Sequence, residues 1–344
     1  MKLNVNLPRR IGLLILAGIA SLPCMMIFAS ATGDMPVSFA VTTKAISNGL
    51  GITHFVLPPV EEGVIWQYRM SRTLMAACSG GGLALSGLVL QALLRNPLAD
   101  PYLLGISAGA STGAVCVMLL GIGGGVLTTG SGAFAGACAA FALIILLSGG
   151  MRENSGRIIL AGIAGTQLFN ALTAYIVSTS ANAEQSRSVM FWLLGSLSGV
   201  RWTDAMLALA VTTAGLLIIL CYARSLDTLT FGEEVSATLG TRILTVRIAL
   251  LLTTALITAI IVSSIGAVGF VGLVIPHVTR MFTGAKHLVS VPVTFLVGCH
   301  FMIMADLVSR TAITHQVLPI GVVTALVGAP AFTFILYRNR GKSL

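Results

Sequence analysis

Residues 91–110 read QALLRNPLADPYLLGISAGA. Pro97 and Pro101 in this stretch bracket a short polar turn, because proline fixes its own φ and disfavours the helical conformation for the residue before it. An apolar run near Thr73 to Leu94 comes directly before the turn, and another near Leu103 to Leu127 comes directly after it. The stretch therefore predicts two apolar helices joined by a rigid turn.

Apolar runs separated by short polar turns continue along the whole chain. A membrane-spanning helix needs about 20 consecutive apolar residues. Ten segments are candidates: Ile11 to Ala31, Thr73 to Leu94, Leu103 to Leu127, Gly130 to Ser148, Ile158 to Val177, Ala205 to Tyr222, Ile248 to Ile265, Ala267 to Phe282, Val291 to Val308 and Leu318 to Tyr337. The eighth segment is short and Pro276 interrupts it, so the predicted number of spans is nine or ten.

The composition excludes a water-soluble fold. Hydrophobic residues make up 56% of the 344 residues, charged residues only 9%, and the mean hydropathy is +0.96, whereas soluble domains carry roughly a quarter charged residues. No Ser/Pro-rich linker or run of charge divides the chain. We therefore expect an all-α polytopic membrane protein of about ten transmembrane helices, with one transmembrane domain over residues 1–344.

The basic residues predict which ends of the spans face the cytoplasm. Lys and Arg collect in cytoplasmic loops. With the N-terminus inside, six of the 20 Lys and Arg residues fall on the outer side: Lys44, Arg69, Arg72, Arg187, Arg201 and Arg310. The other fourteen fall on the inner side, so both termini are predicted to be cytoplasmic. The basic residues that give the net charge of +9 are scattered singly and do not form the basic patch of a nucleic-acid-binding protein.

The first apolar segment resembles a signal peptide in part. Arg9 and Arg10 precede it, and Ala29-Ser30-Ala31 ends it with small residues. Its apolar run is longer than the roughly 7–15 residues of a signal-peptide core, so we expect a retained first helix.

Glycines recur at four-residue spacing in the third and fourth segments. In a helix this spacing forms a smooth strip along which a second backbone can approach closely. The predicted strips contain Gly105, Gly109 and Gly113, then Gly121 and Gly125, and then Gly132 and Gly136.

Arrangements typical of metal sites and enzymes are missing from the sequence. The six cysteines lie singly in apolar runs and no two of the five histidines are four residues apart, so neither a disulfide framework nor a metal site is predicted. The tail Gly341-Lys342-Ser343 resembles the end of a phosphate-binding loop, but Leu336 replaces the first glycine that such a loop requires. No bound cofactor is expected, and no polar cluster suits a membrane enzyme.

An ion-coupled secondary carrier is the distant alternative among transporters. Such carriers usually need an ionisable residue in mid-membrane. The candidate carboxylate, Asp306, lies near the end of its span and shares a helix face with Arg310, four residues on. The sequence therefore does not favour ion coupling.

Two features are expected at the outer surface. Residues 178–199 read as a short interfacial helix anchored by Trp192. Arg69 and Arg72 stand just before the second span and, three residues apart, share one face of a helix end. They either project toward the periplasm or are interfacial anchors whose charged ends reach the membrane surface.

Several motifs closely resemble those of the FecCD-type permeases, the membrane subunits of type II ABC importers for ferric siderophores, haem and cobalamin. The resemblance lies in residues 96–101 (NPLADP), 104–110, 160–162, 192–195, 232–240, 269–277 (GFVGLVIPH), 318–324 (LPIGVVT) and 328–330. It covers nearly the whole chain after about residue 65.

The resemblance implies an all-α fold of ten helices and a set of partners. These are a second permease copy, identical or paralogous, two ATP-binding subunits that hold ATP and magnesium, and a periplasmic binding protein. The chain itself would then be a transport subunit without catalytic activity in the bacterial inner membrane. It would work by alternating access, with a ferric siderophore as the first choice of cargo and haem or cobalamin as alternatives.

The resemblance also implies roles for particular residues. Arg69, Arg72 and Arg310 match arginines that pair with glutamates of the binding protein, although Ser71 stands where the family often has Pro. Fixed charges of this kind give steering and register more than affinity.

Two inner regions have implied roles as well. Residues 227–242 resemble the coupling segment, a pair of short helices that contacts the ATPase through Glu233, Glu234 and Ala237, with Gly240 at the turn; an ordinary charged loop is the alternative. The cytoplasmic gate maps to Asn96, Leu98, Ser155 and Gly156, where Gly156 lacks the hydroxyl that others carry.

Overall fold

The protein is helical throughout the residues that the structure describes. The computed structural model describes residues 7–33, 35, 37–151, 155–314 and 316–338. Within these ranges the only extended pairing is an isolated bridge between Ile313 and Gln316. The all-α fold class is confirmed.

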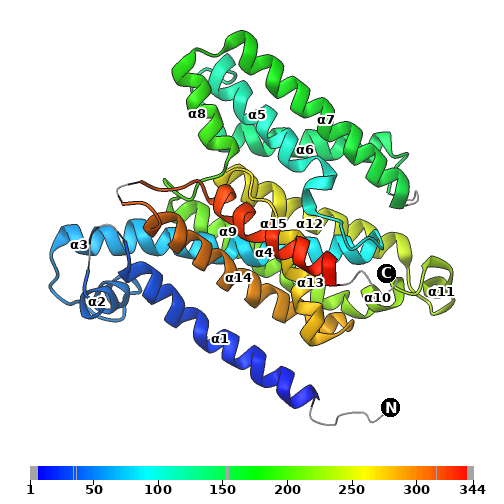
Figure 1. The fold of residues 1–344 in the computed structure, drawn as a ribbon, viewed down its shortest axis with the longest axis horizontal. Helices are drawn as coiled ribbons and strands as arrows, with labels where there is room; N and C mark the ends of the chain where they lie inside the picture. The colour runs from blue at the N-terminus through cyan, green and yellow to red at the C-terminus, as the bar shows by residue number, and fades with distance from the viewer. Residues whose placement is uncertain (1–6, 34, 36, 152–154, 315, 339–344) are drawn as a thin grey trace.

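The helices follow one another with short connections (Figure 1). They are α1 (Leu7–Ala31), α2 (Phe39–Gly49), α3 (Pro59–Gly63), the π-helix η1 (Val64–Met70), α4 (Ser71–Leu93), the 3₁₀ turn η2 (Pro101–Leu104), α5 (Ile106–Leu120), α6 (Thr129–Leu147), α7 (Ser155–Ser180), α8 (Ala183–Leu193), α9 (Trp202–Cys221), α10 (Ala223–Leu229), α11 (Glu233–Thr238), α12 (Ile243–Ile265), α13 (Val271–Thr283), α14 (His287–Thr311) and α15 (Ile320–Arg338).

Each predicted span coincides with a helix, but the helices differ in length. Among the described residues seven segments are long and apolar enough to cross a membrane: Gly12–Ala31, Pro59–Leu93, Thr129–Leu147, Gly156–Ser180, Trp202–Cys221, Ile243–Ile265 and His287–Thr311. The apolar parts of α5 and α15 are shorter, and α13 has 13 residues with Pro276 inside it. Ten spans therefore stay a prediction.

The centre of the molecule is α4. Every residue of α4 except Leu74 is buried, and α9, α12, α13 and α14 pack around it. Small residues allow close approaches: a Cβ atom at Gly80 would lie 2.0 Å from the carbonyl oxygen of Gly298 in α14, and one at Gly87 would lie 1.8 Å from that of Gly272 in α13. This packing surrounds the polar side chains of α4 with protein. A helix that faced lipid could not carry them, because polar groups in lipid lack partners.

Helices α5, α6 and α7 pack on one another beside this central group (Figure 1). The crossing of α5 and α6 confirms the predicted glycine strips in part. Gly109 and Gly113 of α5 meet Gly132 and Gly136 of α6 at backbone contact distance. Two other predicted glycines, Gly121 and Gly125, instead lie in the turn between the helices, each with a positive φ.

The two ends of the molecule carry different elements. Figure 1 shows α10 and α11 at one end, together with the start of α1 and the end of α15, and α2 and α3 at the opposite end. We call these the α11 end and the α2 end. Helix α8 begins with a capping box between Asn182 and Gln185, so the predicted separate short helix in residues 178–199 is present.

Candidate functional site

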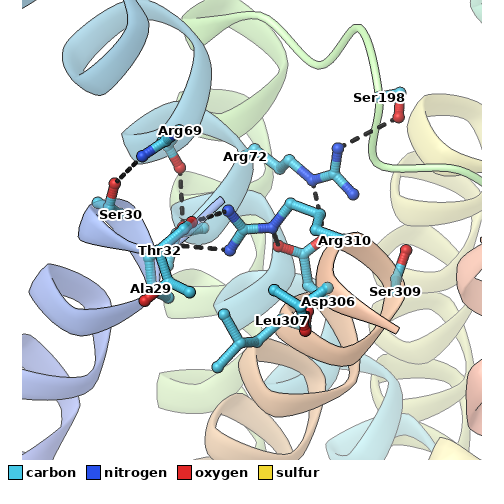
Figure 2. Close-up of polar contacts among 12 residues, drawn as sticks. Ala29, Ser30, Thr32, Arg69, Arg72, Ser198, Asp306, Leu307, Ser309 and Arg310 are labelled. Carbon is cyan, nitrogen blue, oxygen red and sulfur yellow. Dashed lines mark hydrogen bonds and ion pairs between the residues drawn. The ribbon is translucent and has the colours of Figure 1, made fainter. Parts of the chain in front are cut away.

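A cluster of three arginines and one aspartate, which we call the arginine cluster, lies at the α2 end. Figure 2 shows its contacts. Arg69 comes from η1, Arg72 from α4, and Asp306 and Arg310 from α14. All four are buried, with 4%, 1%, 0% and 6% of their surface exposed, respectively. Three cations and one anion are thus withdrawn from solvent together, which is stable only when nearly every charge has a partner.

Asp306 is the centre of the cluster. Arg72 Nε donates to Asp306 Oδ1 at 2.7 Å, and Arg310 Nε lies 3.0 Å from Asp306 Oδ2. Arg72 Nη1 also donates to the hydroxyls of Ser198 at 3.2 Å and Tyr68 at 3.3 Å. Asp306 therefore joins α14 to α4 through Arg72, and it also pairs with Arg310 on its own helix.

Arg69 and Arg310 bind the end of α1. Arg69 donates to the carbonyl oxygens of Ser30, Ala31 and Met35 at 3.1, 3.2 and 2.6 Å. Arg310 donates to those of Thr32 at 2.8 Å and Ala29 at 3.0 Å. The last four carbonyls of a helix lack partners within it, and cations stabilise that end. The two arginines thus hold α1 against the central helices.

The expectation that these arginines project from the surface is wrong for this structure. Both side chains are buried in the bundle: Arg69 donates to the end of α1 and Arg72 to Asp306 of α14. Asp306 is the partner that sequence reasoning missed, because 234 residues separate it from Arg72. Contact between the three arginines and a binding protein stays a prediction.

The predicted coupling segment is a pair of short helices, α10 and α11, at the α11 end. Ser236 Oγ donates back to the carbonyl oxygen of Gly232 at 2.6 Å, and Gly240 turns the chain with a φ of +82°. Glu233 forms an ion pair with the buried Arg247 of α12, which fixes α11 to the bundle. Glu234 and Ala237 are exposed.

The segment also presents apolar side chains that sequence reasoning missed. Phe231 is 70% exposed, Val235 46% and Leu239 63%. Exposed apolar residues gathered on one short element indicate a surface that another protein covers. The sequence signal for them was available: Val235 and Leu239 are four residues apart and so share a helix face.

The residues of the predicted gate also lie near the α11 end. Asn96 Oδ1 accepts from the backbone N–H of Leu98 at 2.9 Å, and Asp100 Oδ1 accepts from that of Tyr102 at 2.8 Å. These two side chains fix the turn that Pro97 and Pro101 begin. Leu98 is half exposed.

The other half of the predicted gate is at the start of α7. Ser155 is its first residue, and Gly156, the second, has open space around its Cα. Residues 152–154, directly before them, lie outside the described residues. Gating by this pair and by Asn96 and Leu98 stays a prediction.

The comparisons with known proteins agree with this fold. The model of the FecCD transport family matches residues 14–338. The chain is 38% identical over 293 residues to the cobalamin import system permease protein BtuC of Halobacterium salinarum, covering 84% of this chain and 78% of that protein. It is 39% identical over 287 residues to the vitamin B12 import system permease protein BtuC of Klebsiella pneumoniae, covering 81% and 83%.

Solved structures give the same result. A metal-chelate type ABC transporter in an inward-facing conformation matches with a TM-score of 0.75 and 31% identity, covering 87% of this chain and 97% of that chain. PsaBC of Streptococcus pneumoniae shares the fold with a TM-score of 0.55 at 19% identity. The helical fold, the match to the family model over nearly the whole chain and these relatives lead to one conclusion: the chain belongs to the FecCD transport family, whose members are permease subunits of ABC importers.

Proposed function

We propose that this chain carries cobalamin, or a metal chelate of similar bulk, across the bacterial inner membrane by alternating access. The observation that carries the proposal is the 38–39% identity, over four fifths of the chain, to permeases named for cobalamin and vitamin B12. The relatives' names do not support the ferric siderophore that we expected from the sequence, and they favour the alternative cargo. Haem and ferric siderophores become controls in the experiment below.

The charge distribution supports the proposed orientation. The α11 end carries α10, α11, the start of α1 and the end of α15 (Figure 1). Fourteen of the 20 Lys and Arg residues are assigned to this side, and basic residues collect in the cytoplasm. The α11 end and both termini would therefore be cytoplasmic, and the α2 end would face the periplasmic binding protein.

The exposed face of α7 supports a second permease copy. Gln167 and Asn170 lie in mid-helix and are exposed, beside the exposed Tyr175. Uncharged amides facing lipid would leave hydrogen bonds unmade. A second copy of the permease, identical or paralogous, would cover this face and form a translocation path with it.

The coupling segment supports a cytoplasmic ATPase partner. The exposed apolar side chains of Phe231, Val235 and Leu239 need a protein surface to cover them. Two ATPase subunits, one for each permease copy, would hold the ATP and magnesium. Closure of the ATPase pair would move α11, and through the Glu233–Arg247 ion pair would move α12.

Uptake by reconstituted vesicles tests the proposed cargo. The chain is assembled with its ATPase and binding protein in proteoliposomes, and uptake of radiolabelled cobalamin, haem and a ferric siderophore is compared. We expect uptake of cobalamin that requires ATP. Uptake of the siderophore alone would contradict the proposal that cobalamin is the cargo. Uptake driven by an ion gradient without ATP would contradict the proposal of an ATP-driven importer and favour a secondary carrier.

A charge placed on the coupling segment is expected to uncouple transport. Val235→Asp and Leu239→Asp put a carboxylate where the ATPase surface would have to bury it, and burying an unpaired charge is unfavourable. Copurification with the ATPase and ATP-dependent uptake should both fall by at least about tenfold, while the folded permease is recovered as usual. The matched control is Val56→Asp, the same substitution at a fully exposed valine at the α2 end, and it should retain ATPase binding. An equal loss of ATPase binding in Val56→Asp would contradict the assignment of the coupling segment as the surface that contacts the ATPase.

A further inference from the structure

A polar cavity lies at the α11 end and borders the coupling segment, whose Thr230 is part of its lining. Its volume is about 280 Å³. It lies where the end of α4, the connection between α10 and α11, the end of α13 and the start of α14 meet. Its polar lining consists of Gln91, Arg95, Thr230, Arg280 and His287.

The cavity carries positive charge without a carboxylate in its lining. Neither Arg95 nor Arg280 forms an ion pair among the described residues. Asp227 contacts the lining through His287: its Oδ1 accepts from the backbone N–H of His287 at 2.8 Å and lies 2.7 Å from His287 Nδ1. Asp227 is thus occupied by His287, and the two guanidinium charges remain uncompensated.

Gln91 fixes the position of Arg280. Arg280 Nη2 donates to Gln91 Oε1 at 2.6 Å. Gln91 Nε2 in turn donates to the carbonyl oxygens of Gly272 and Leu273, each at 3.3 Å. A neutral amide orients the guanidinium group in this arrangement but does not balance its charge. A half-buried guanidinium group that is oriented but not neutralised is preorganised to bind an anion.

Arg95, the other arginine of the lining, has an unusual backbone conformation. Its φ is +49°, in the left-handed region that residues other than glycine seldom adopt. Its N–H bonds to the carbonyl oxygen of Ala92 at 3.3 Å as α4 ends. Its side chain is exposed, so it can reach a ligand that enters from solvent or from the membrane interface.

The surroundings of the cavity point to a lipid. Met281 and Phe282, directly after Arg280, are 54% and 70% exposed, and Leu288, directly after His287, is 55% exposed. Exposed apolar residues that follow the lining residues of a basic cavity in the sequence suit a ligand with a charged head and an apolar tail. Basic pockets between transmembrane helices on the cytoplasmic side bind anionic lipid head groups. The volume is slightly below the roughly 300–1,000 Å³ of pockets for drug-sized ligands, so the cavity suits a phosphate group better than a bulky cargo.

We propose that this cavity binds the phosphate group of an anionic phospholipid, with Arg95 and Arg280 as its donors. The planar guanidinium fork suits phosphate oxygens. The bound head group would join the end of α4, the end of α13 and the start of α14 to the connection between α10 and α11 in the coupling segment. The inference requires that the chain lies in a membrane and does not depend on which cargo it carries.

Lipid retention tests the proposal without ATPase, binding protein or cargo. The purified chain is exchanged into nanodiscs of phosphatidylcholine containing a small fraction of phosphatidylglycerol, and the lipid that remains after detergent extraction is counted by native mass spectrometry. Wild type should retain phosphatidylglycerol. Arg95→Gln, at an exposed position that cannot disturb the fold, and Arg280→Gln should each reduce retention by about tenfold, the effect of one charged hydrogen bond. Arg280→Lys should retain an intermediate amount, because it keeps the charge but loses the fork.

The matched control is Arg224→Gln, which removes an exposed arginine of α10 that does not line the cavity. It should retain phosphatidylglycerol as wild type does. Equal retention in wild type and Arg95→Gln, or equal loss in the control, would overturn the proposal. A second arm adds inorganic phosphate to nanodiscs of phosphatidylcholine alone. If inorganic phosphate raised the thermal stability of the chain in these nanodiscs and no lipid was retained in the first arm, the cavity would be assigned to free phosphate. The proposal of a lipid ligand would then be wrong.

Discussion

Asp306→Asn is expected to destabilise the folded chain by about 3–5 kcal/mol, the range for breaking a buried ion pair by removing one partner. Asparagine has nearly the same shape as aspartate, so no cavity forms. The change leaves the guanidinium groups of Arg72 and Arg310 buried without the carboxylate that lies 2.7 and 3.0 Å from them. The lost charge, and not lost packing, would cause the effect. The midpoint of thermal unfolding in detergent measures it.

A control and a rescue separate this explanation from a general sensitivity to substitution. Asp204→Asn removes another carboxylate, which accepts from the N–H of Arg201 at the start of α9 at 3.1 Å, and a cap of this kind contributes about 1 kcal/mol. The double variant Asp306→Asn/Arg72→Met should recover part of the loss, because it removes one buried charge as well. If the midpoint of thermal unfolding of Asp306→Asn were no lower than that of Asp204→Asn, the arginine cluster would not be what holds α1, α4 and α14 together.

Composition and long apolar runs predict the helices because a membrane leaves few alternatives. Backbone groups in lipid must bond within a helix, so an apolar run of sufficient length specifies its own structure. The rigid turn after α4 is predicted for the same local reason: Pro97 and Pro101 fix backbone angles directly. In the polar stretch after α1, hydropathy gives no such signal, and the structure places α2 and α3 there.

The site is less predictable than the fold because burial is a tertiary property. Arg69 and Arg72 stand before a span, and sequence reasoning places such residues at the surface. Burial becomes acceptable only because Asp306, 234 residues after Arg72, and the carbonyl end of α1 supply partners. Arg280 is a similar case, since its neighbour in space, Gln91, comes from another helix 189 residues away. Spacing along one helix contains no information about either contact.

Gly136→Leu is expected to prevent α5 and α6 from packing. A Cβ atom at Gly136 would lie 2.2 Å from the carbonyl oxygen of Gly109 and 2.9 Å from the Cα of Gly113. A side-chain neighbour can rotate away, but these atoms belong to the backbone of α5, so the two helices would have to separate. Overpacking usually destabilises by about 1–3 kcal/mol, and by more where a backbone must shift. Most of the variant should therefore be recovered as aggregate.

A graded series measures this effect by the fraction of monodisperse protein after size-exclusion chromatography. Gly136→Ala adds the single Cβ atom that meets the Gly109 carbonyl and should already lower the fraction, and Gly136→Leu should lower it much further. Gly12→Ala is the matched control, since Gly12 is a helical glycine with no neighbour within 4 Å of a built Cβ. Alanine in a helix is favoured over glycine by up to about 1 kcal/mol, so this control should be recovered at least as well as wild type. Recovery of Gly136→Ala at the level of Gly12→Ala would mean that the close approach of α5 and α6 does not hold the two helices together.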